Sequence, residues 1–196
     1  MIRTNINANF PHHLTNCVVA DDTVYVADYT EQSRHQITKR GTELFISHPP
    51  KDIDCFTVSN PIRLDIDGIP FDRNSFVKPN GNIASQCECV IYPHCSNSCS
   101  WICFIELKYS NKSENNIKNL NKARLQLFKT QYYYKSKGVF GKTNPCYLLA
   151  SLPMQSPPFA NMTLSPAYLL AMKRKHNIII RFLNSVRIIN DRLLFV

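Results

Sequence analysis

The chain has 196 residues with 44% apolar content, and its 23 lysines and arginines outnumber its 14 acidic residues to give a net charge of +9 at pH 7. This size fits one domain with a hydrophobic core. No apolar run approaches the roughly 18 residues of a membrane span, so no membrane partner is expected. The first residues, MIRTNINANFPHHL, lack the apolar core of a secretory signal. We therefore expect an intracellular, cytoplasmic protein whose eight cysteines stay reduced.

The positive charge is concentrated in the second half of the chain. Residues 1–100 carry 8 lysines and arginines against 11 acidic residues, residues 101–150 carry 9 against 2, and residues 151–196 carry 6 against 1. A basic half is typical of a protein with a polyanionic partner, and nucleic acid is the simplest such partner. A solvated basic surface without a partner is the alternative.

The first 85 residues form an irregular, β-rich part of what we expect to be a single domain. Residues 17–29 place β-branched and aromatic residues around an Asp-Asp turn, as a hairpin does. Residues 42–47 are typical of a strand or a short helix, and residues 56–72 of short strands separated by turns.

From residue 86 the pattern is sharper. QCECVIY (86–92) and WICFIELKYS (101–110) predict two strands joined by a turn, and the second is apolar enough to be central in a sheet. A helix is expected over 114–137, and CYLLASLP (146–153) predicts a buried strand. A strand, a helix and a strand in succession imply a parallel pair.

The C-terminal residues predict a second helix and two closing strands. Ser165 and Pro166 are favourable residues at the start of a helix, which we expect to extend to residue 177. The apolar segments 178–183 and 192–196 predict the strands. The sequence therefore predicts an α/β fold in which helices flank one mixed β-sheet.

The helix over 114–137 predicts one apolar face and one basic face. Its buried stripe recurs at steps of three and four residues and comprises Ile117, Leu120, Ala123, Leu127, Thr130 and Tyr134. The cations that fall largely off this stripe are Lys118, Lys122, Lys129 and Lys135.

Two glutamates and one lysine form the candidate chemical site. Side chains alternate along a strand, so Glu106 and Lys108 point to the same face. If the strands 86–92 and 101–110 pair as a hairpin, Glu88 joins them there. Two carboxylates can hold Mg²⁺, and such an ion activates water and stabilises the charge of a phosphate under attack. Lys108 would orient the water or stabilise the oxyanion.

The pattern CECVIY…WICFIELK, followed by a basic helix and a buried strand, resembles the core of the PD-(D/E)xK nuclease superfamily, which has a restriction-endonuclease-like fold. The resemblance assigns Glu88 to the first acid, Glu106 to the second and Lys108 to the lysine. It covers residues 86–150, and residues 165–196 fit the remaining helix and strands.

The resemblance also implies a fourth site residue and a further acid. ARLQLFKTQ (123–131) is similar to the helix that brings a glutamine to the site in some members, and Gln126 is the best match. The family usually has Asp where this chain has Glu88. Many members add another acid from an early helix, for which Glu31 and Glu43 are the candidates here.

The function implied by the resemblance is Mg²⁺- or Mn²⁺-dependent hydrolysis of DNA or RNA phosphodiester bonds, in defence or in mobile-element biology. The cations expected to contact the nucleic acid are Lys112, Lys118, Lys122 and Lys129. A homodimer or a larger assembly stays open. A second hypothesis is a catalytically inactive protein of the same fold that binds nucleic acid or serves in an assembly, since Glu replaces Asp and the further acid is unassigned.

A third hypothesis is a zinc-stabilised interaction domain. The candidate ligands are Cys87, Cys89, His94, Cys95, Cys99 and Cys103. Their spacing is not that of the paired C-x2-C units of common zinc knuckles, and the strand cysteines fit an apolar environment. Cys95 and Cys99, in the turn beside His94, are the ones available to a metal.

Overall fold

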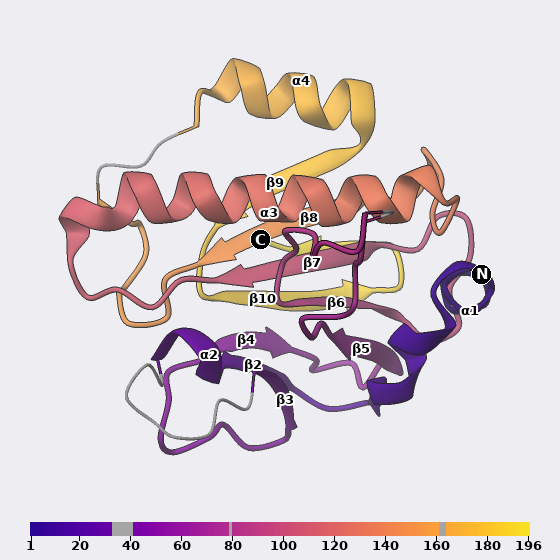
Figure 1. The fold of residues 1–196 in the computed structure, drawn as a ribbon, viewed down its shortest axis with the longest axis horizontal. Coiled ribbons are helices and arrows are strands. Elements are labelled where there is room, and N and C mark those ends of the chain that lie inside the picture. The colour runs from indigo at the N-terminus through magenta and orange to yellow at the C-terminus, as the bar shows by residue number, and fades with distance from the viewer. Residues whose placement is uncertain (33–40, 79, 161–163) are drawn as a thin grey trace.

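The computed structural model describes residues 1–32, 41–78, 80–160 and 164–196, with the side chains of residues 31 and 32 excepted. Two mixed sheets and the helices around them make up this part of the chain, which confirms the α/β fold class (Figure 1). The single mixed sheet expected from the sequence is wrong, because the N-terminal and C-terminal strands form a second sheet of their own.

The first sheet, sheet A, contains the predicted chemical site. Its strands, in spatial order, are β1 (Val18–Ala20), β5 (Ile66–Pro70), β6 (Cys89–Pro93), β7 (Ile102–Leu107), β8 (Cys146–Ser151) and β9 (Ile178–Phe182). Strands β1, β5, β6 and β7 pair antiparallel, whereas β7, β8 and β9 pair parallel. The predicted parallel crossover from β7 to β8 is therefore confirmed.

The second sheet, sheet B, joins strands from both ends of the chain. Its strands, in spatial order, are β11 (Leu193–Phe195), β10 (Ser185–Asn190), β4 (Phe56–Ser59), β2 (Val24–Asp28) and β3 (Thr42–Ile46). The parallel pair β4–β10 connects the two halves of the sequence. The two closing strands expected over 178–183 and 192–196 are present as β9 and β11, but they lie in different sheets, and β11 pairs with β10, which the sequence did not predict.

The expected hairpin over residues 17–29 is also wrong. Strand β1 pairs with β5 in sheet A, while β2 pairs with β3 and β4 in sheet B. The Asp21-Asp22 turn therefore leads the chain from one sheet to the other. Ala20 and Val24, on either side of this turn, are both buried in the core between the sheets.

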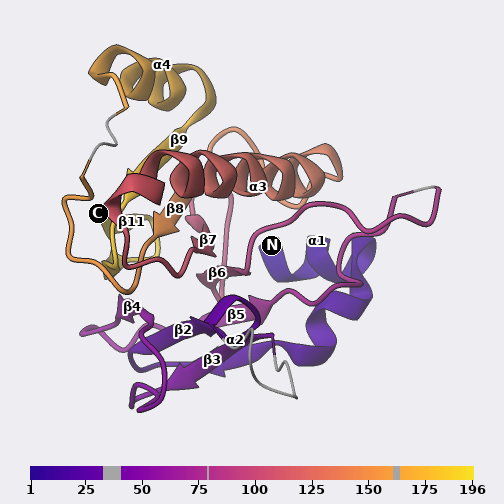
Figure 2. The same ribbon diagram turned by 60° about the vertical axis from the view of Figure 1, so that its left-hand side comes forward.

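The helices occupy the side of sheet A that faces away from sheet B (Figure 2). The helical segments are α1 (Ile2–Asn9), the 3-10 turn η1 (Pro11–Asn16), α2 (Tyr29–Gln32), the 3-10 turn η2 (Ser113–Asn115), α3 (Asn116–Ser136) and α4 (Pro166–His176). Of these, α2 is the exception, since it follows β2 and contacts β3 of sheet B. Helix α3 lies across β7 and β8, and α4 lies above β9. Among the residues that the structure describes, no helix is both long and apolar enough to cross a membrane.

Helix α4 begins and ends where local chemistry favours it. The Ser165 side chain accepts a hydrogen bond from the Tyr168 N–H at 3.2 Å, and Pro166 occupies the first position of the helix. Asn177 then adopts a left-handed conformation with φ of 55°, which stops the helix and directs the chain into β9. The start predicted at Ser165-Pro166 is confirmed.

The two faces of β7 separate the apolar core from the polar site. Trp101, Cys103, Ile105 and Leu107 point toward sheet B and pack in the core between the sheets. Ile102 and Phe104 point toward α3, and Glu106 follows them on that face. The helix stripe is confirmed at five of its positions, but Ile117 is 50% exposed while its neighbour Asn116 is buried.

Candidate active site

The pairing of β6 with β7 brings Glu88 near Glu106. Cys89 faces Ile105 and Val90 faces Phe104 in the antiparallel pair β6–β7. Glu88 is the residue before β6, and its backbone N–H donates at 3.0 Å to the carbonyl of Ile105, which is already opposite Cys89. The regular register therefore ends at Glu88 in a bulge. Glu88 and Glu106 are still close enough for the charge of Glu106 to raise the pKa of Glu88. The hairpin predicted from the sequence therefore brings the two carboxylates near each other.

Lys108 lies against Glu106 in the interior. Its Nζ atom is 2.5 Å from Oε1 of Glu106, and the two residues are 5% and 0% exposed. The Lys108 backbone N–H donates to the Ser151 carbonyl at 2.9 Å, which fixes this residue to the end of β8. Each charge of an ion pair at this depth compensates the other, so removal of one partner would leave the other buried without compensation.

The surroundings of Glu88 shift the pKa of its carboxyl group. Its Oε2 atom accepts a hydrogen bond from the Thr42 hydroxyl at 2.6 Å. Burial raises the pKa of Glu88 well above its ordinary value, and the charges of Glu106 and Asp28 raise it further, while Thr42 and Lys108 act in the opposite direction. Carboxylates that repel each other in this way are a favourable environment for a cation.

Asp28 is an acid of the site that the sequence analysis missed. It lies at the end of β2 opposite Thr42, so its side chain shares the face from which Thr42 reaches Glu88. Asp28 is 1% exposed, its Oδ1 atom accepts from the Thr30 N–H at 2.8 Å, and its own N–H donates to the Tyr109 hydroxyl at 3.1 Å. An acid at the end of an apolar strand was the signal that could have found it.

Of the two acids named from the sequence for this role, Glu43 does not supply it. Glu43 lies beside Thr42 on β3 and therefore points to the opposite face of sheet B. The backbone of Glu31 is in α2, and its side chain is outside the described residues. The strand that carries Asp28 belongs to sheet B and reaches the site because the two sheets pack against each other. No local sequence pattern predicts this packing.

A cleft of about 720 Å³ opens over these residues. Its walls include Asp28 from β2, Thr42 from β3, Glu88, Lys108, and Lys122 and Gln126 from α3. Glu106 lies beneath Lys108 and is fully buried. The volume is in the usual range of about 300–1,000 Å³ for small-ligand sites.

Gln126 reaches the cleft as expected, and its amide group has a structural partner. Its Nε2 atom donates to the backbone carbonyl of Gln86 at 2.8 Å, next to the start of β6. The Oε1 atom is buried and has no hydrogen-bond partner among the described residues. Gln126 therefore holds the segment that carries Glu88 and leaves an acceptor near the cleft.

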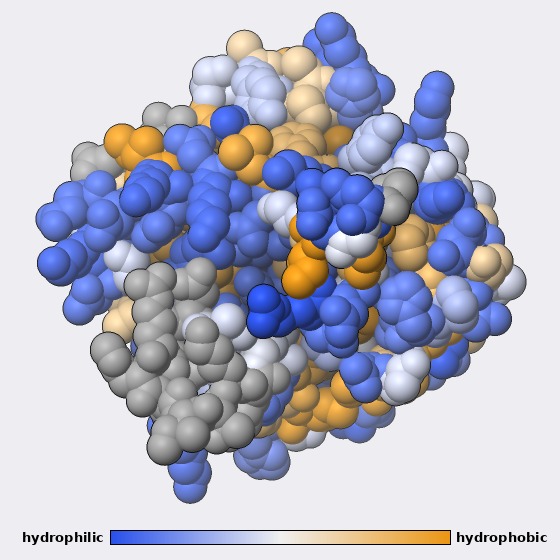
Figure 3. Space-filling view, viewed as in Figure 1, coloured by the Kyte–Doolittle hydropathy of each residue, from blue (hydrophilic) through white to orange (hydrophobic). Residues whose placement is uncertain are grey.

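The lysines expected to contact nucleic acid all reach solvent, and three of them share one side of α3. At about 100° per residue, Lys118, Lys122, Gln126 and Lys129 fall within an arc of about 80°. Figure 3 shows hydrophilic side chains gathered over this helix. Lys112 precedes η2 and is separate from this face. The basic face of α3 continues into the cleft through Lys122.

The donor set at the cleft fits a hard divalent cation held by two carboxylates. In the described ranges no three His, Cys, Asp or Glu side chains are grouped closely enough to hold a metal ion by themselves. Mg²⁺ rarely needs such a cage, because it keeps several waters and is bound through one or two carboxylates together with substrate phosphates. Glu88 lines the cleft, Glu106 is buried beneath Lys108 next to it, and these two carboxylates are the ones that could hold such an ion, with Asp28 adding negative charge near Glu88.

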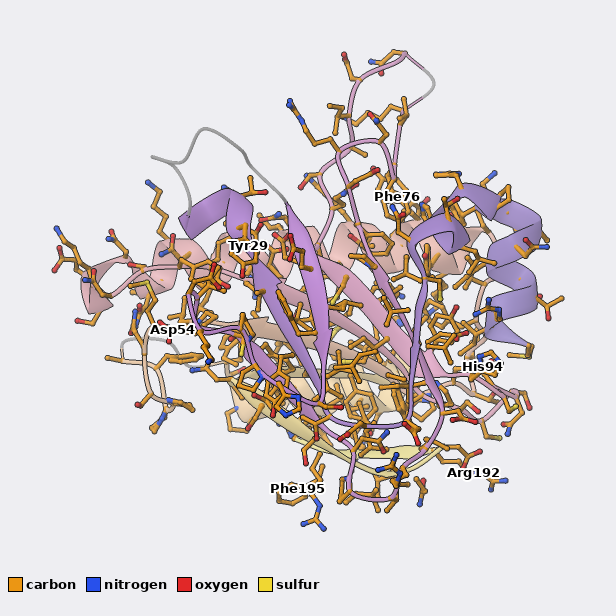
Figure 4. All side chains as sticks on the ribbon, turned by 90° about the horizontal axis from the view of Figure 1, so that it is seen from below. Tyr29, Asp54, Phe76, His94, Arg192 and Phe195 are labelled. Carbon is orange, nitrogen blue, oxygen red and sulfur yellow. The ribbon has the colours of Figure 1, made fainter. Side chains whose placement is uncertain are left out.

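The turn between β6 and β7 offers no matching cysteine site. All eight cysteines are free thiols, and Cys95 and Cys99 are exposed. His94 instead directs its Nδ1 atom to Asp67 at 2.7 Å. Figure 4 shows His94 beside α1, well apart from Tyr29, which follows Asp28. The zinc hypothesis therefore gains no support from the geometry of this turn.

The chain was compared with models of protein families, with curated proteins and with solved structures, and none of them matches it.

Proposed function

We propose that this protein is a metal-dependent nuclease that hydrolyses phosphodiester bonds in DNA or RNA. One observation carries the proposal: the pairing of β6 and β7 brings Glu88 close to Glu106, with Lys108 at 2.5 Å from Glu106, beside a cleft bordered by the basic face of α3. This arrangement supports membership of the PD-(D/E)xK superfamily, which the residues alone suggested.

The proposed roles follow from the position of each group. Glu88 and Glu106 would hold Mg²⁺ or Mn²⁺, and such an ion, when bound, activates water and neutralises charge on the phosphate. Lys108 holds its ammonium beside Glu106, where it can orient the attacking water and stabilise the oxyanion. Gln126 acts as a positioning residue, since it holds the backbone of Gln86 next to Glu88.

The basic face of α3 supplies the contact with the substrate backbone. Lys118, Lys122 and Lys129 reach solvent on one side of the helix and lead toward the cleft. Cations in such a row neutralise successive phosphates and release counterions. The reacting phosphate would then enter between Lys122 and the carboxylates.

The test is cleavage of plasmid DNA, single-stranded DNA and single-stranded RNA in the presence of Mn²⁺. We expect the wild type to cut at least one substrate and Glu106→Gln and Lys108→Met to lose about 100-fold or more of the rate. Glu114→Gln is the matched control, because Glu114 is exposed at the start of the helical segment before α3. A wild type that is inert on all three substrates, or variants as active as the control, would contradict the proposal.

A second candidate is an inactive protein of the same fold that binds nucleic acid. The observation that favours it is the close Lys108–Glu106 pair, which neutralises one of the two acids without any metal ion. Under this hypothesis wild type and Glu106→Gln bind an oligonucleotide equally and neither cleaves it, while reversal of the α3 lysines abolishes binding.

A further inference from the structure

We propose that the outer edge of β9, under helix α4, is a docking site for an extended peptide segment rich in acidic residues. A groove of about 350 Å³ is lined there by Leu169, Leu170 and Lys173 from α4 and by Ile179 to Arg181 from β9. This surface belongs to no part of the proposed nuclease site and does not depend on it.

Strand β9 is an edge strand whose outward backbone groups face no neighbouring strand of sheet A. It is the last strand of this sheet and pairs parallel with β8 on one side. The Asn177 carbonyl accepts from the Cys146 N–H, and the Leu183 N–H donates to the Ala150 carbonyl, so odd-numbered residues point their backbone groups toward β8. The backbone groups of Ile178, Ile180 and Phe182 therefore point outward.

One outward group already has a partner that could be displaced. The guanidinium of Arg181 donates from Nη1 to the Ile180 carbonyl at 2.9 Å. No hydrogen bond of the described residues occupies the outward N–H groups of Ile178, Ile180 and Phe182. A row of open donors and acceptors is a template for one more strand, which is how β-strand addition recognises peptides.

Helix α4 forms an apolar wall above this edge. None of its 11 residues is buried, and Leu170 is 47% exposed. Figure 1 shows the helix lying outside α3, above β9. An added strand would cover Leu169 and Leu170 with alternate side chains, which supplies apolar burial in addition to the backbone hydrogen bonds.

The positive charge of the groove favours an acidic peptide as its occupant. Lys173 and Arg181 line it, Arg174 and Lys175 follow on the exposed last turn of α4, and residues 151–196 contain one acidic residue, Asp191, at the turn beyond β10. A carboxylate on the partner strand would take the Arg181 guanidinium from the Ile180 carbonyl as the new strand forms. A second copy of this chain would instead bring like charges together across the pair, which is destabilising.

The experiment titrates the full chain with a capped peptide that alternates valine and glutamate over ten residues. We expect saturable binding by calorimetry and slower hydrogen exchange at the amides of Ile178, Ile180 and Phe182. The amide of Arg181, which pairs with β8, should not change. A peptide with lysine in place of glutamate, and one that is N-methylated at alternate residues, should fail to bind.

Lys173→Glu and Arg181→Glu should each weaken binding of the peptide about tenfold. Lys173 is exposed, so its variant tests the charge without disturbing the core, and Lys51→Glu, on the loop after sheet B strand β3, is the control that should bind as the wild type does. Absence of peptide binding, or binding that is unchanged in both groove variants, would overturn the proposal. Protection of the same amides by an oligothymidine instead of the peptide, or by self-association of the unliganded chain, would overturn it as well.

Discussion

His13 is a buried histidine whose two ring nitrogens both have hydrogen-bond partners. Its Nε2 atom lies 2.7 Å from the Ser75 carbonyl, which can only accept, so Nε2 carries the proton. The Nδ1 atom, 2.8 Å from the Tyr134 hydroxyl, then accepts from it. Burial lowers the pKa of His13 from 6.5 to about 4.

The first prediction is a loss of stability on acidification that depends on His13. Between the two pKa values the unfolded chain binds a proton that the folded chain does not, so the free energy of unfolding falls as the pH drops from 6.5 to 4, by up to about 3 kcal/mol. Urea unfolding at pH 7 and pH 4 measures this loss. In His13→Gln the difference between the two pH values should be smaller, and an unchanged difference would refute the assignment.

The pKa of Glu88 is shifted in the opposite direction to that of His13, so its effect on stability has the opposite dependence on pH. Because its pKa is raised, the folded chain keeps a proton that the unfolded chain releases above the ordinary value of 4.5. Its contribution to stability is therefore favourable at low pH and is lost as the pH rises through the raised pKa.

The second prediction is that Glu88→Gln melts at a higher temperature than the wild type at pH 8, and that this gain shrinks as the pH falls toward 4.5. Thermal melts of both proteins across this pH range measure the difference, and a gain that is constant with pH would contradict the raised pKa.

The third prediction concerns the cation that would relieve this repulsion. If Glu88 and Glu106 hold it, Mn²⁺ at about 100 times its dissociation constant stabilises the wild type by about 2.7 kcal/mol at pH 8. Glu88→Gln and Glu106→Gln should gain little, whereas the exposed control Glu114→Gln should respond as the wild type does. Calorimetric melting measures the stabilisation by Mn²⁺. An equal rise in melting temperature in the wild type and all three variants would show that the cation binds elsewhere.

At the scale of elements, α3 combines a buried stripe and a basic side. Leu120, Leu127 and Tyr134 are fully buried against sheet A, while Lys118, Lys122 and Lys129 remain in contact with solvent. The helix is therefore fixed by its apolar side and leaves the other side available to a polyanion.

The fourth prediction tests that side of α3. Charge reversal at Lys118, Lys122 or Lys129 should weaken binding of a single-stranded oligonucleotide and reduce the slope of log affinity against log salt by about 0.7 for each phosphate that the variant no longer neutralises. Fluorescence anisotropy at four salt concentrations measures both quantities. Lys51→Glu should leave the slope unchanged, and equal slopes in all variants would exclude α3 as the contact surface.

The sequence predicted those elements whose signals are local. The strands β6 and β7, the crossover through α3 and the start of α4 at Ser165 follow from periodicity, turn residues and caps within short windows. The proximity of Glu88 and Glu106 follows from the same hairpin. The burial expected for Ile117 is wrong. Extension of the apolar stripe by one turn toward the start of the helix predicts a buried Ile117, but α3 begins at Asn116, and Asn116 is the residue that is buried there.

The elements that the sequence did not predict depend on pairing between distant segments. Strand β10 is recognised as a member of sheet B only through its parallel pairing with β4. Asp28 enters the site for the same reason, since its strand is positioned by β3 and β4 and its N–H is bound by Tyr109 from beyond β7. Neither contact has a counterpart in local composition, turn chemistry or hydrophobic period.

At the scale of the whole molecule, the core between the sheets connects the candidate site to both halves of the chain. Cys89, Ile105 and Leu107 from sheet A pack in one buried cluster with Phe56 and Ile188 from sheet B. The strands that hold Glu88 and Glu106 are therefore supported by residues from distant parts of the sequence. Disruption of this packing would move the two carboxylates relative to Asp28.

Trp101 reports on this packing directly. It is the single tryptophan, it is fully buried, its Nε1–H donates to the Asn190 carbonyl at 2.8 Å, and its backbone N–H donates to the Asp191 carbonyl at 3.1 Å. These hydrogen bonds join the start of β7 in sheet A to the end of β10 in sheet B. The environment of the indole therefore changes as soon as the two sheets separate.

The fifth prediction is that the two sheets unfold together. Since the parallel pair β4–β10 and the shared apolar core connect both halves of the chain, neither sheet can keep its buried face covered alone. Tryptophan fluorescence and far-ultraviolet circular dichroism should give coincident transitions in urea. Ile188→Ala, which truncates a fully buried side chain of sheet B, should shift both transitions together and cost about 2–5 kcal/mol. A fluorescence change that precedes the loss of secondary structure would show instead that sheet B detaches first, and the acids of the site would then be held by sheet A alone.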